Sequence, residues 1–207
     1  PAVVCPSTPN NLTTAISLPS TKTPIRLTGT KSISFIPSQT LRYMQTKAPV
    51  IIESQGATPV VWQIRKGVWA GATICSSLQN EQWFVGGSGA LTSKSILSIV
   101  NSGFSESAVE IEVYTSTGAL EPKQVAISPN STKSISLDTL APGEDSLAIS
   151  VKTKSGRVSA FLFDERKKGL RSLGADYVAA VSAPKKVLTI PAISTNESAA
   201  GRIFSEP

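Results

Sequence analysis

The sequence predicts an all-β protein made of two tandem immunoglobulin-like β-sandwich units of about 100 residues each. Three observations predict this fold class. Short runs alternate apolar and polar residues, segments rich in Ser, Thr, Gly and Pro separate these runs, and several landmarks recur about 100 residues later. Charged residues make up only 16% of the 207 residues, below the average of about 25% for globular domains. No stretch carries a convincing helical apolar stripe.

The alternation is clearest in the C-terminal half of the chain. In AVEIEVY (108–114) the apolar residues stand at 109, 111 and 113, and in SLAISVK (146–152) they stand at 147, 149 and 151. A period of two places such residues on one face of a strand. We expect seven strands here, reading QWFVG, SILSIV, AVEIEVY, QVAIS, KSISL, SLAISVK and VSAFLF. The intervening segments TSTG, SPNS, APGED and TKSG have turn compositions.

A repeat links the two halves of the chain. The segment TKSIS occurs at 30–34 and again at 132–136. Downstream, a turn glycine recurs at Gly56 and Gly156, and a basic pair that ends in glycine recurs at Gly67 and Gly169. We therefore expect residues 16–75 and 108–180 to form related sheets. The two TKSIS segments should be equivalent strands, with Ile33 and Ile135 both pointing into cores.

The repeat divides the chain into three parts. Residues 1–79 form a first sandwich unit, in which AVVC (2–5) stands in for a missing opening strand. Residues 80–184 form a second unit. Residues 185–207 are expected to begin a third, incomplete unit, in which Lys185 to Ile193, containing KVLTIPAI, resemble the QWFVG opening and should form a strand. An unclosed unit exposes a strand edge, so we expect either a longer native protein or an intermolecular contact at this end.

The two cysteines, Cys5 and Cys75, fit no zinc or redox spacing. In a Ser/Thr-rich β protein a single structural disulfide is the first interpretation, and two buried free thiols are the alternative. If the AVVC segment takes the place of a missing strand, the two cysteines can meet. A disulfide predicts an oxidising compartment outside the cytoplasm.

The composition excludes several kinds of site. The chain has no histidine, which removes Ser-His-Asp and Cys-His catalysis and histidine metal sites. The densest carboxylate pair, Asp164-Glu165, would point to opposite faces of a strand. Glu110 and Glu112 share a face, but it is the polar face of an amphipathic strand. We expect no catalytic residue, no metal and no cofactor. The net charge of +6 is scattered, without the clustering typical of nucleic-acid binding.

Aromatic residues offer the remaining candidate site. Trp83 and Phe84 are adjacent, so one of them should face outward if they lie in a strand. Trp69 stands in GVWAGA, which we interpret as a loop. An exposed Trp83 or Trp69 could stack on a sugar, whereas packing in a core is the competing interpretation. In VSAFLF (158–163) both faces are apolar, as in a central strand or one covered by a neighbouring unit.

The order of several segments resembles an uncharacterised family of actinobacterial cell-envelope proteins, a domain-of-unknown-function family. The segments are LSIVNSG, VEIEVYTSTGAL, DTLAPGEDSLAISVKTKSGRVSAFLFDE, GLRSLGADYV and APKKVLTIPAI, spread over roughly residues 81 to 193. CPSTP and APVIIESQGATPVV in the first half also look like it. The resemblance implies an exported protein, usually longer and held by an N-terminal membrane helix. It implies no activity and no site residues.

These observations lead to a non-enzymatic structural or adhesive module of a bacterial cell envelope. Its partners would be other envelope proteins, copies of itself or envelope polymers, and not nucleic acid. Membrane attachment is expected only through an anchor that this sequence does not contain. The alternative is a carbohydrate-binding module that recognises a cell-wall polysaccharide through exposed tryptophan. A hydrolase is a third hypothesis, which needs a carboxylate whose mutation abolishes turnover.

Overall fold

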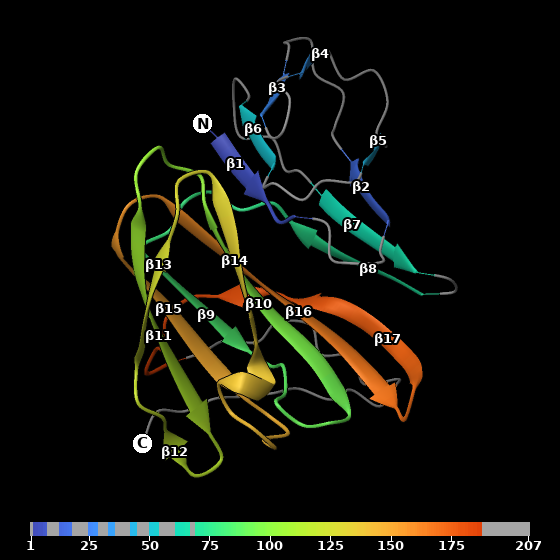
Figure 1. The fold of residues 1–207 in the computed structure, drawn as a ribbon, viewed down its shortest axis with the longest axis vertical. Helices are drawn as coiled ribbons and strands as arrows, with labels where there is room; N and C mark the ends of the chain where they lie inside the picture. The colour runs from blue at the N-terminus through green and yellow to red at the C-terminus, as the bar shows by residue number, and fades with distance from the viewer. Residues whose placement is uncertain are drawn as a thin grey trace.

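The computed structural model describes residues 2–7, 13–17, 25–28, 33–35, 42–44, 50–53, 61–66 and 69–187 (Figure 1). Within these ranges the chain is almost entirely β-structure, and every strand pairing is antiparallel. The one helix of the described part is a 3-10 turn, η1 (Leu137–Thr139). No described helix is long and apolar enough to cross a membrane. The predicted all-β class is confirmed.

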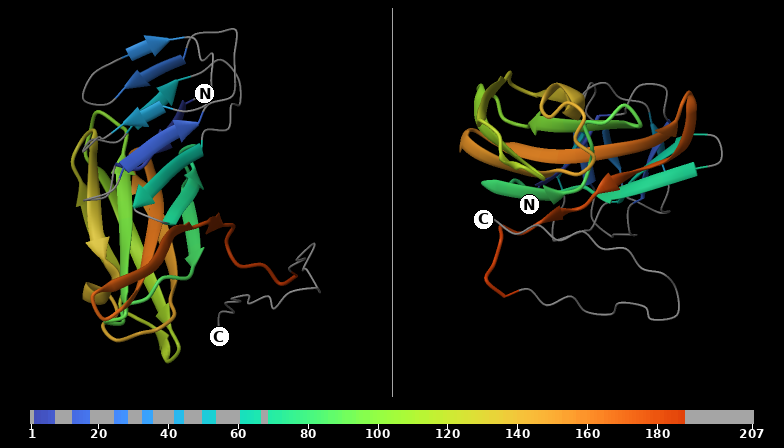
Figure 2. Two further views of the ribbon diagram at one scale, coloured as in Figure 1. Left: turned by 90° about the vertical axis from the view of Figure 1, so that its right-hand side faces the viewer. Right: turned by 90° about the horizontal axis from the view of Figure 1, so that it is seen from below.

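The N-terminal part of the chain forms two four-stranded sheets. One sheet has the order β1-β6-β3-β4, and the other has the order β5-β2-β7-β8. Their strands are β1 (Ala2–Cys5), β2 (Thr13–Ser17), β3 (Ile25–Thr28), β4 (Ile33–Phe35), β5 (Arg42–Met44), β6 (Val50–Glu53), β7 (Val61–Lys66) and β8 (Trp69–Ile74). In Figures 1 and 2 these strands occupy one end of the molecule.

The rest of the described chain forms a β-sandwich. One sheet has the order β14-β10-β16-β17, and the other has the order β12-β11-β15-β9-β18 with β13 also paired to β11. The strands are β9 (Glu81–Val85), β10 (Ser93–Asn101), β11 (Ser107–Thr115), β12 (Gly118–Ala119), β13 (Lys123–Ile127), β14 (Ser131–Ser136), β15 (Ala148–Ser155), β16 (Val158–Lys168), β17 (Arg171–Val178) and β18 (Ala180–Val181).

The core of this sandwich comes from the predicted alternation. Val109, Ile111 and Val113 of β11 are all at most 4% exposed, and they pack with Leu97 and Leu162 of the facing sheet. All seven strands expected in this half are present. β17 was not expected, because its sequence RSLGADYV shows no regular alternation and its exposure follows none.

The two pairs of sheets are connected in the same order. If β1 to β4 are matched with β9, β10, β11 and β13, and β5 to β8 with β14 to β17, every pairing of the first set recurs in the second. In the sandwich the second strand, β10, pairs with the fifth, β14, and the third strand, β11, pairs with the sixth, β15. The first strand, β9, lies beside β15, and the seventh, β16, lies beside β10.

The expectation that the two TKSIS segments form equivalent strands is wrong. Ile33 lies in β4, whose counterpart in the second set is β13, whereas Ile135 lies in β14, whose counterpart is β5. The two segments are therefore in non-equivalent strands, one strand apart. Of the glycine landmarks, Gly156 lies between β15 and β16, whereas Gly56, which follows β6 in the sequence, lies outside the described residues. Ile135 is buried at 8% exposed, and the side chain of Ile33 lies outside the described residues.

β16 is an interior strand of its four-stranded sheet, as its two apolar faces predicted. It pairs with β10 on one side and β17 on the other. Every residue from Val158 to Phe163 is buried. Ala160 and Leu162 face the sandwich core, while Phe161 packs against Val4 of β1. The outer face of β16 is thus covered by the N-terminal part of the chain.

Candidate binding site at the junction of the two sheet pairs

The edge strand β8 of the first sheet pair meets the edge strand β17 of the sandwich (Figure 1). The backbone N–H of Ala72 donates to Asp176 Oδ1 at 2.8 Å. Gly71 makes this approach possible, because a Cβ at that position would lie 2.7 Å from Asp176 Oδ1 and 2.8 Å from the carbonyl oxygen of Ala175. The carboxylate of Asp176 therefore completes hydrogen bonding at an edge that β8 leaves open.

The segment after β8 is fastened to both sides of the junction. Cys75 forms a disulfide with Cys5, as predicted, and both residues are buried. Next to it, Val4 and Ser76 exchange two backbone hydrogen bonds of 2.8 and 3.0 Å. Farther along, the carbonyl of Asn80 accepts from the backbone N–H of Thr153 at 2.7 Å. A linker held at three points fixes how the two sheet pairs sit relative to each other.

A small apolar cluster fills the junction between these attachments. Val4, Val100 and Phe161 are each at most 4% exposed and contact one another. Leu78 and Tyr177 pack against the cluster. The ring of Tyr177 also meets the ring of Phe163 edge-on, with the centroids 5.7 Å apart. Burial of apolar surface between the two sheet pairs stabilises their relative placement.

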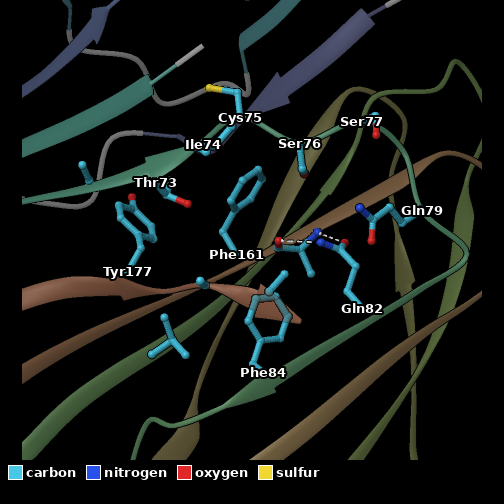
Figure 3. Close-up of a pocket in the computed structure, with 15 residues that line it drawn as sticks. Thr73, Ile74, Cys75, Ser76, Ser77, Gln79, Gln82, Phe84, Phe161 and Tyr177 are labelled. Carbon is cyan, nitrogen blue, oxygen red and sulfur yellow. Dashed lines mark hydrogen bonds between the residues drawn. The ribbon is translucent and has the colours of Figure 1, made fainter. Parts of the chain in front are cut away.

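A cavity of about 550 Å³ lies beside this cluster (Figure 3). β8 and the following linker form one wall, and β9, β16 and the end of β17 form the other. The residues that line it are Ala72, Thr73, Ile74, Cys75, Ser76, Ser77, Gln79, Gln82, Phe84, Ala160, Phe161, Tyr177, Val178, Ala179 and Ala180. Ile74 is 62% exposed, so it stands at the surface rather than deep inside. The cavity is in the size range of small-molecule pockets.

Gln82 supplies the most specific polar contact of the cavity wall. Its Oε1 accepts from the backbone N–H of Ala160 at 2.6 Å, and its Nε2 donates to the carbonyl of Ala160 at 3.3 Å. The β16–β17 pairing stops at Leu162 and Val178, so Ala160 has no strand partner on that side. The buried amide of Gln82 takes the place of that partner across the two sheets, and Figure 3 shows both bonds.

The cavity lining offers binding groups rather than acid–base groups. Its described residues include hydroxyls, amides and aromatic rings but no carboxylate, ammonium or guanidinium group. Cys75 is tied in the disulfide and is not a nucleophile. The described part of the chain also holds no group of three or more metal-ligating side chains. Its walls therefore suit an uncharged or apolar ligand.

Within the part of the chain that the structure describes, two ionisable groups with a shifted pKa lie on the outer face of the β9–β15–β11 sheet. Hydrogen bonding to Lys154 is the main cause that lowers the pKa of Glu110 below 4.5. Hydrogen bonding to Glu112 is the main cause that raises the pKa of Lys152 above 10.5. Glu110 and Glu112 form ion pairs of 2.8 Å with these lysines across β11 and β15. The arrangement is a cross-strand ladder of opposite charges, which stabilises a sheet.

The carboxylates Asp164 and Glu165 do not converge on one site. Asp164 accepts hydrogen bonds from the hydroxyls of Ser93 and Ser95, at 2.8 and 2.5 Å, and pairs with Arg166 at 2.9 Å. Glu165, on the opposite face of β16, is buried at 7% exposed. These contacts give Asp164 a structural role, because they join β16 to the start of β10.

The tryptophan candidates require correction. Trp83 is 3% exposed, although an outward face was expected of either Trp83 or Phe84. Phe84 enters the sandwich core, and Trp83 on the other face stacks on Tyr114 with ring centroids 5.5 Å apart. Its indole N–H donates to Glu81 Oε1 at 2.8 Å. Trp83 therefore has no free ring face for a sugar.

Trp69 is the first residue of β8, paired with Lys66, and does not lie in the loop that was expected. Its side chain lies outside the described residues. Sequence reasoning also missed Gln82 and Asp176, and it did not place Phe161 at the junction. Only the two apolar faces of VSAFLF signalled that something would cover Phe161.

These features describe an all-β protein with four antiparallel sheets, in which a disulfide lies at the junction of the two sheet pairs. The chain belongs to the family of unknown function DUF5719, which matches residues 53–205 of the 207-residue chain. The match spans the sandwich, β7 and β8, and it includes the linker side of the junction. No curated protein and no solved structure matches the chain.

Proposed function

We propose that the chain is a non-enzymatic structural or adhesive module of a bacterial cell envelope. In this proposal it consists of two tandem immunoglobulin-like sandwich units and acts through protein–protein or envelope-polymer contacts. The shared pairing order of the two sheet pairs supports the tandem arrangement. The Cys5–Cys75 disulfide indicates an oxidising compartment outside the cytoplasm and so supports the location.

The observation that carries the proposal is the junction. Consecutive domains joined by flexible linkers move independently by default. Here the linker is held by a disulfide, a backbone bridge and the Val4–Val100–Phe161 cluster. Such a junction serves a protein that must present surfaces at a fixed spacing or transmit force. It is not required for chemistry confined to one domain.

Rotational diffusion of the N-terminal sheet pair and of the sandwich, here called the two halves, tests whether the junction is rigid. ¹⁵N relaxation should fit one diffusion tensor for the amides of β6–β8 and of β10–β16. Reduction of the disulfide combined with Asp176→Ala should separate the two sets of rotational correlation times. Asp138→Ala, at an exposed position far from β8, is the matched control and should leave them joined. Independent tumbling of the two halves in the oxidised wild-type protein contradicts the proposal.

Binding to envelope fragments tests the role itself. The oxidised wild-type protein should co-sediment saturably with envelope fragments stripped of soluble protein. Reduced Asp176→Ala should bind several-fold more weakly, because a surface that spans both halves is no longer held together. Equal binding by the oxidised wild-type protein and the reduced Asp176→Ala variant would contradict the proposed function. Catalytic turnover that depends on one carboxylate would indicate an enzyme instead.

The carbohydrate-binding alternative now depends on Trp69, because the ring faces of Trp83 are covered. Titration with cell-wall polysaccharide, followed by tryptophan fluorescence, distinguishes the two functions. We expect no saturable change in emission. A saturable change that Trp69→Ala abolishes would favour the carbohydrate-binding function.

A further inference from the structure

Two leucines stand fully in solvent at one end of the sandwich. Leu91 is 101% exposed and Leu170 is 106% exposed. Leu91 lies in the loop between β9 and β10, and Leu170 lies in the turn between β16 and β17. Neither residue contributes to the core, and leaving two large apolar side chains in water has a free-energy cost that a partner would remove.

The two leucines belong to neighbouring loops. β10 and β16 are antiparallel, and Ser93 at the start of β10 pairs with Arg166 near the end of β16. The pairing continues outward, because the backbone N–H of Lys167 donates to the carbonyl of Thr92 at 2.7 Å. Leu91 and Leu170 therefore extend from adjacent points of the same sheet end.

Three cationic residues stand on the strand ends that carry these leucines. Lys94, Lys168 and Arg171 are exposed, and Lys168 and Arg171 pair across the turn that carries Leu170. We call these three residues, together with Leu91 and Leu170, the basic leucine tip. Two carboxylates, Glu144 and Asp145, lie on the other side of the Leu91 loop, where the carbonyl of Glu144 accepts from the N–H of Gly89. They reduce the positive charge of this end.

We propose that the basic leucine tip docks on an anionic lipid surface. Apolar side chains at loop tips can enter the boundary between headgroups and acyl chains, while Lys and Arg remain among the anionic headgroups. An anionic wall polymer would attract the cations but has no apolar layer to receive the leucines. The combination therefore favours a lipid surface. The inference depends on these loops alone and does not need the structural role proposed above.

Co-sedimentation of the oxidised full chain with lipid vesicles tests the inference. The probes are phosphatidylcholine vesicles with and without about a third phosphatidylglycerol, at low and at high salt. The wild-type protein should bind the anionic vesicles, more weakly at high salt, and bind the neutral ones poorly. Leu91→Ser with Leu170→Ser should weaken binding by about tenfold or more. Lys168→Gln and Arg171→Gln should each weaken it by about fivefold.

The opposite end of the sandwich supplies the control. Phe104 is 99% exposed in the loop between β10 and β11, and Arg157 is exposed beside the start of β16. Phe104→Ser with Arg157→Gln makes the same kind of change and should leave binding unaltered. Glu144→Gln with Asp145→Asn should strengthen binding. All these positions are exposed except the half-buried Glu144, and unchanged melting temperatures confirm that each variant folds.

Three results would overturn the inference. One is no binding of the wild-type protein to the anionic vesicles at low salt. Another is loss of binding by the Phe104 and Arg157 control as large as that by the tip variants. The third is binding that depends on Lys168 and Arg171 but is indifferent to the two leucines, which would indicate a contact with a polyanion instead of a lipid surface.

Discussion

Gln82 shows how one side chain can replace a missing strand. Its amide donates to and accepts from the backbone of Ala160, at a point where β17 no longer pairs with β16. Both groups of Ala160 are buried between sheets, where an unpaired backbone donor or acceptor is costly. Gln82 thus lets the chain leave one sheet early and form β18 on the other.

The first prediction concerns this amide. Gln82→Met keeps the side-chain volume but leaves the N–H and carbonyl of Ala160 without partners, so the free energy of unfolding should fall by about 2 kcal/mol. Chemical denaturation measures the change. Gln79→Met is the control, because Gln79 is exposed and should change the free energy by less than about 0.5 kcal/mol. Equal effects at both positions would contradict the role given to Gln82.

At the scale of single residues, sequence reasoning succeeded where a local rule decides the outcome. The inward positions of β11, for example, follow from alternation. The predicted exposure of Trp83 was wrong, because alternation indicates only that Trp83 and Phe84 lie on opposite faces of the strand. Whether the second face is open depends on Tyr114, more than 30 residues away in the sequence.

The second prediction concerns the charge ladder between β11 and β15. Lys152 donates to both carboxylate oxygens of Glu112, at 2.8 and 2.9 Å, and its pKa is raised above 10.5. A raised lysine pKa contributes stability below about pH 10.5 that is lost as the pH rises through the folded-state pKa. The contribution is less than about 1 kcal/mol, because Lys152 is one-third exposed.

Lys152→Met should therefore lower the free energy of unfolding at pH 7, and the difference from wild type should narrow above pH 10.5. Urea denaturation at a series of pH values measures it. Lys133→Met, at an exposed position of β14, provides the comparison and should show no such narrowing. A difference that stays constant up to pH 12 would mean that packing of the lysine stem, and not its charge, stabilises the sheet.

At the scale of elements, the strands with strong alternation were all predictable, and β17 was not. Its sequence contains Leu173, Gly174 and Ala175, and Leu173 is 59% exposed, so no apolar face identifies it. β17 forms a strand because its backbone pairs with the edge of β16 that β10 does not occupy. The TKSIS repeat misled for a related reason, since Ser-rich edge strands look alike and β4 and β14 are both edges of their sheets.

The third prediction concerns the molecule as a whole. The Cys5–Cys75 disulfide closes a separation of 70 positions, and the chain-entropy estimate for such a loop is about 4 kcal/mol. Reduction should lower the free energy of unfolding by up to that amount. It should also speed hydrogen exchange at the bridged amides of Val4 and Ser76 far more than at Val125 of β13, which lies in the other sheet pair. Denaturation and exchange, each with and without reductant, measure both effects.

A thiol assay on unfolded, unreduced protein provides the direct check. No reactive thiol should be found. Two reactive thiols per chain would contradict the disulfide and, with it, the argument for a location outside the cytoplasm. Exchange that accelerates equally at Val4 and at Val125 would show that the bond stabilises the chain globally rather than holding the junction.

At the scale of the whole molecule, the sequence predicted the disulfide and the covered face of β16 but not the junction that joins them. Val4, Val100 and Phe161 come from three distant segments, and their contact depends on how the two sheet pairs are placed. The cavity beside them follows from the same placement. Local patterns carry no information about it, which is why the candidate site could not be located from the sequence.

The shared strand-pairing order of the two sheet pairs creates a risk of misfolding. Each strand of the N-terminal pair has a counterpart in the sandwich that pairs with the equivalent neighbours, also antiparallel. Neighbouring domains of like topology can exchange such elements and become trapped in misassembled states. Differences in sequence between matched strands disfavour such exchange: β1 reads AVVC where β9 reads EQWFV, and β7 reads VWQIRK where β16 reads VSAFLFDERKK. A strand placed in the wrong sheet would bring side chains of the wrong size against the core, so these differences favour pairing of each strand within its own sheet.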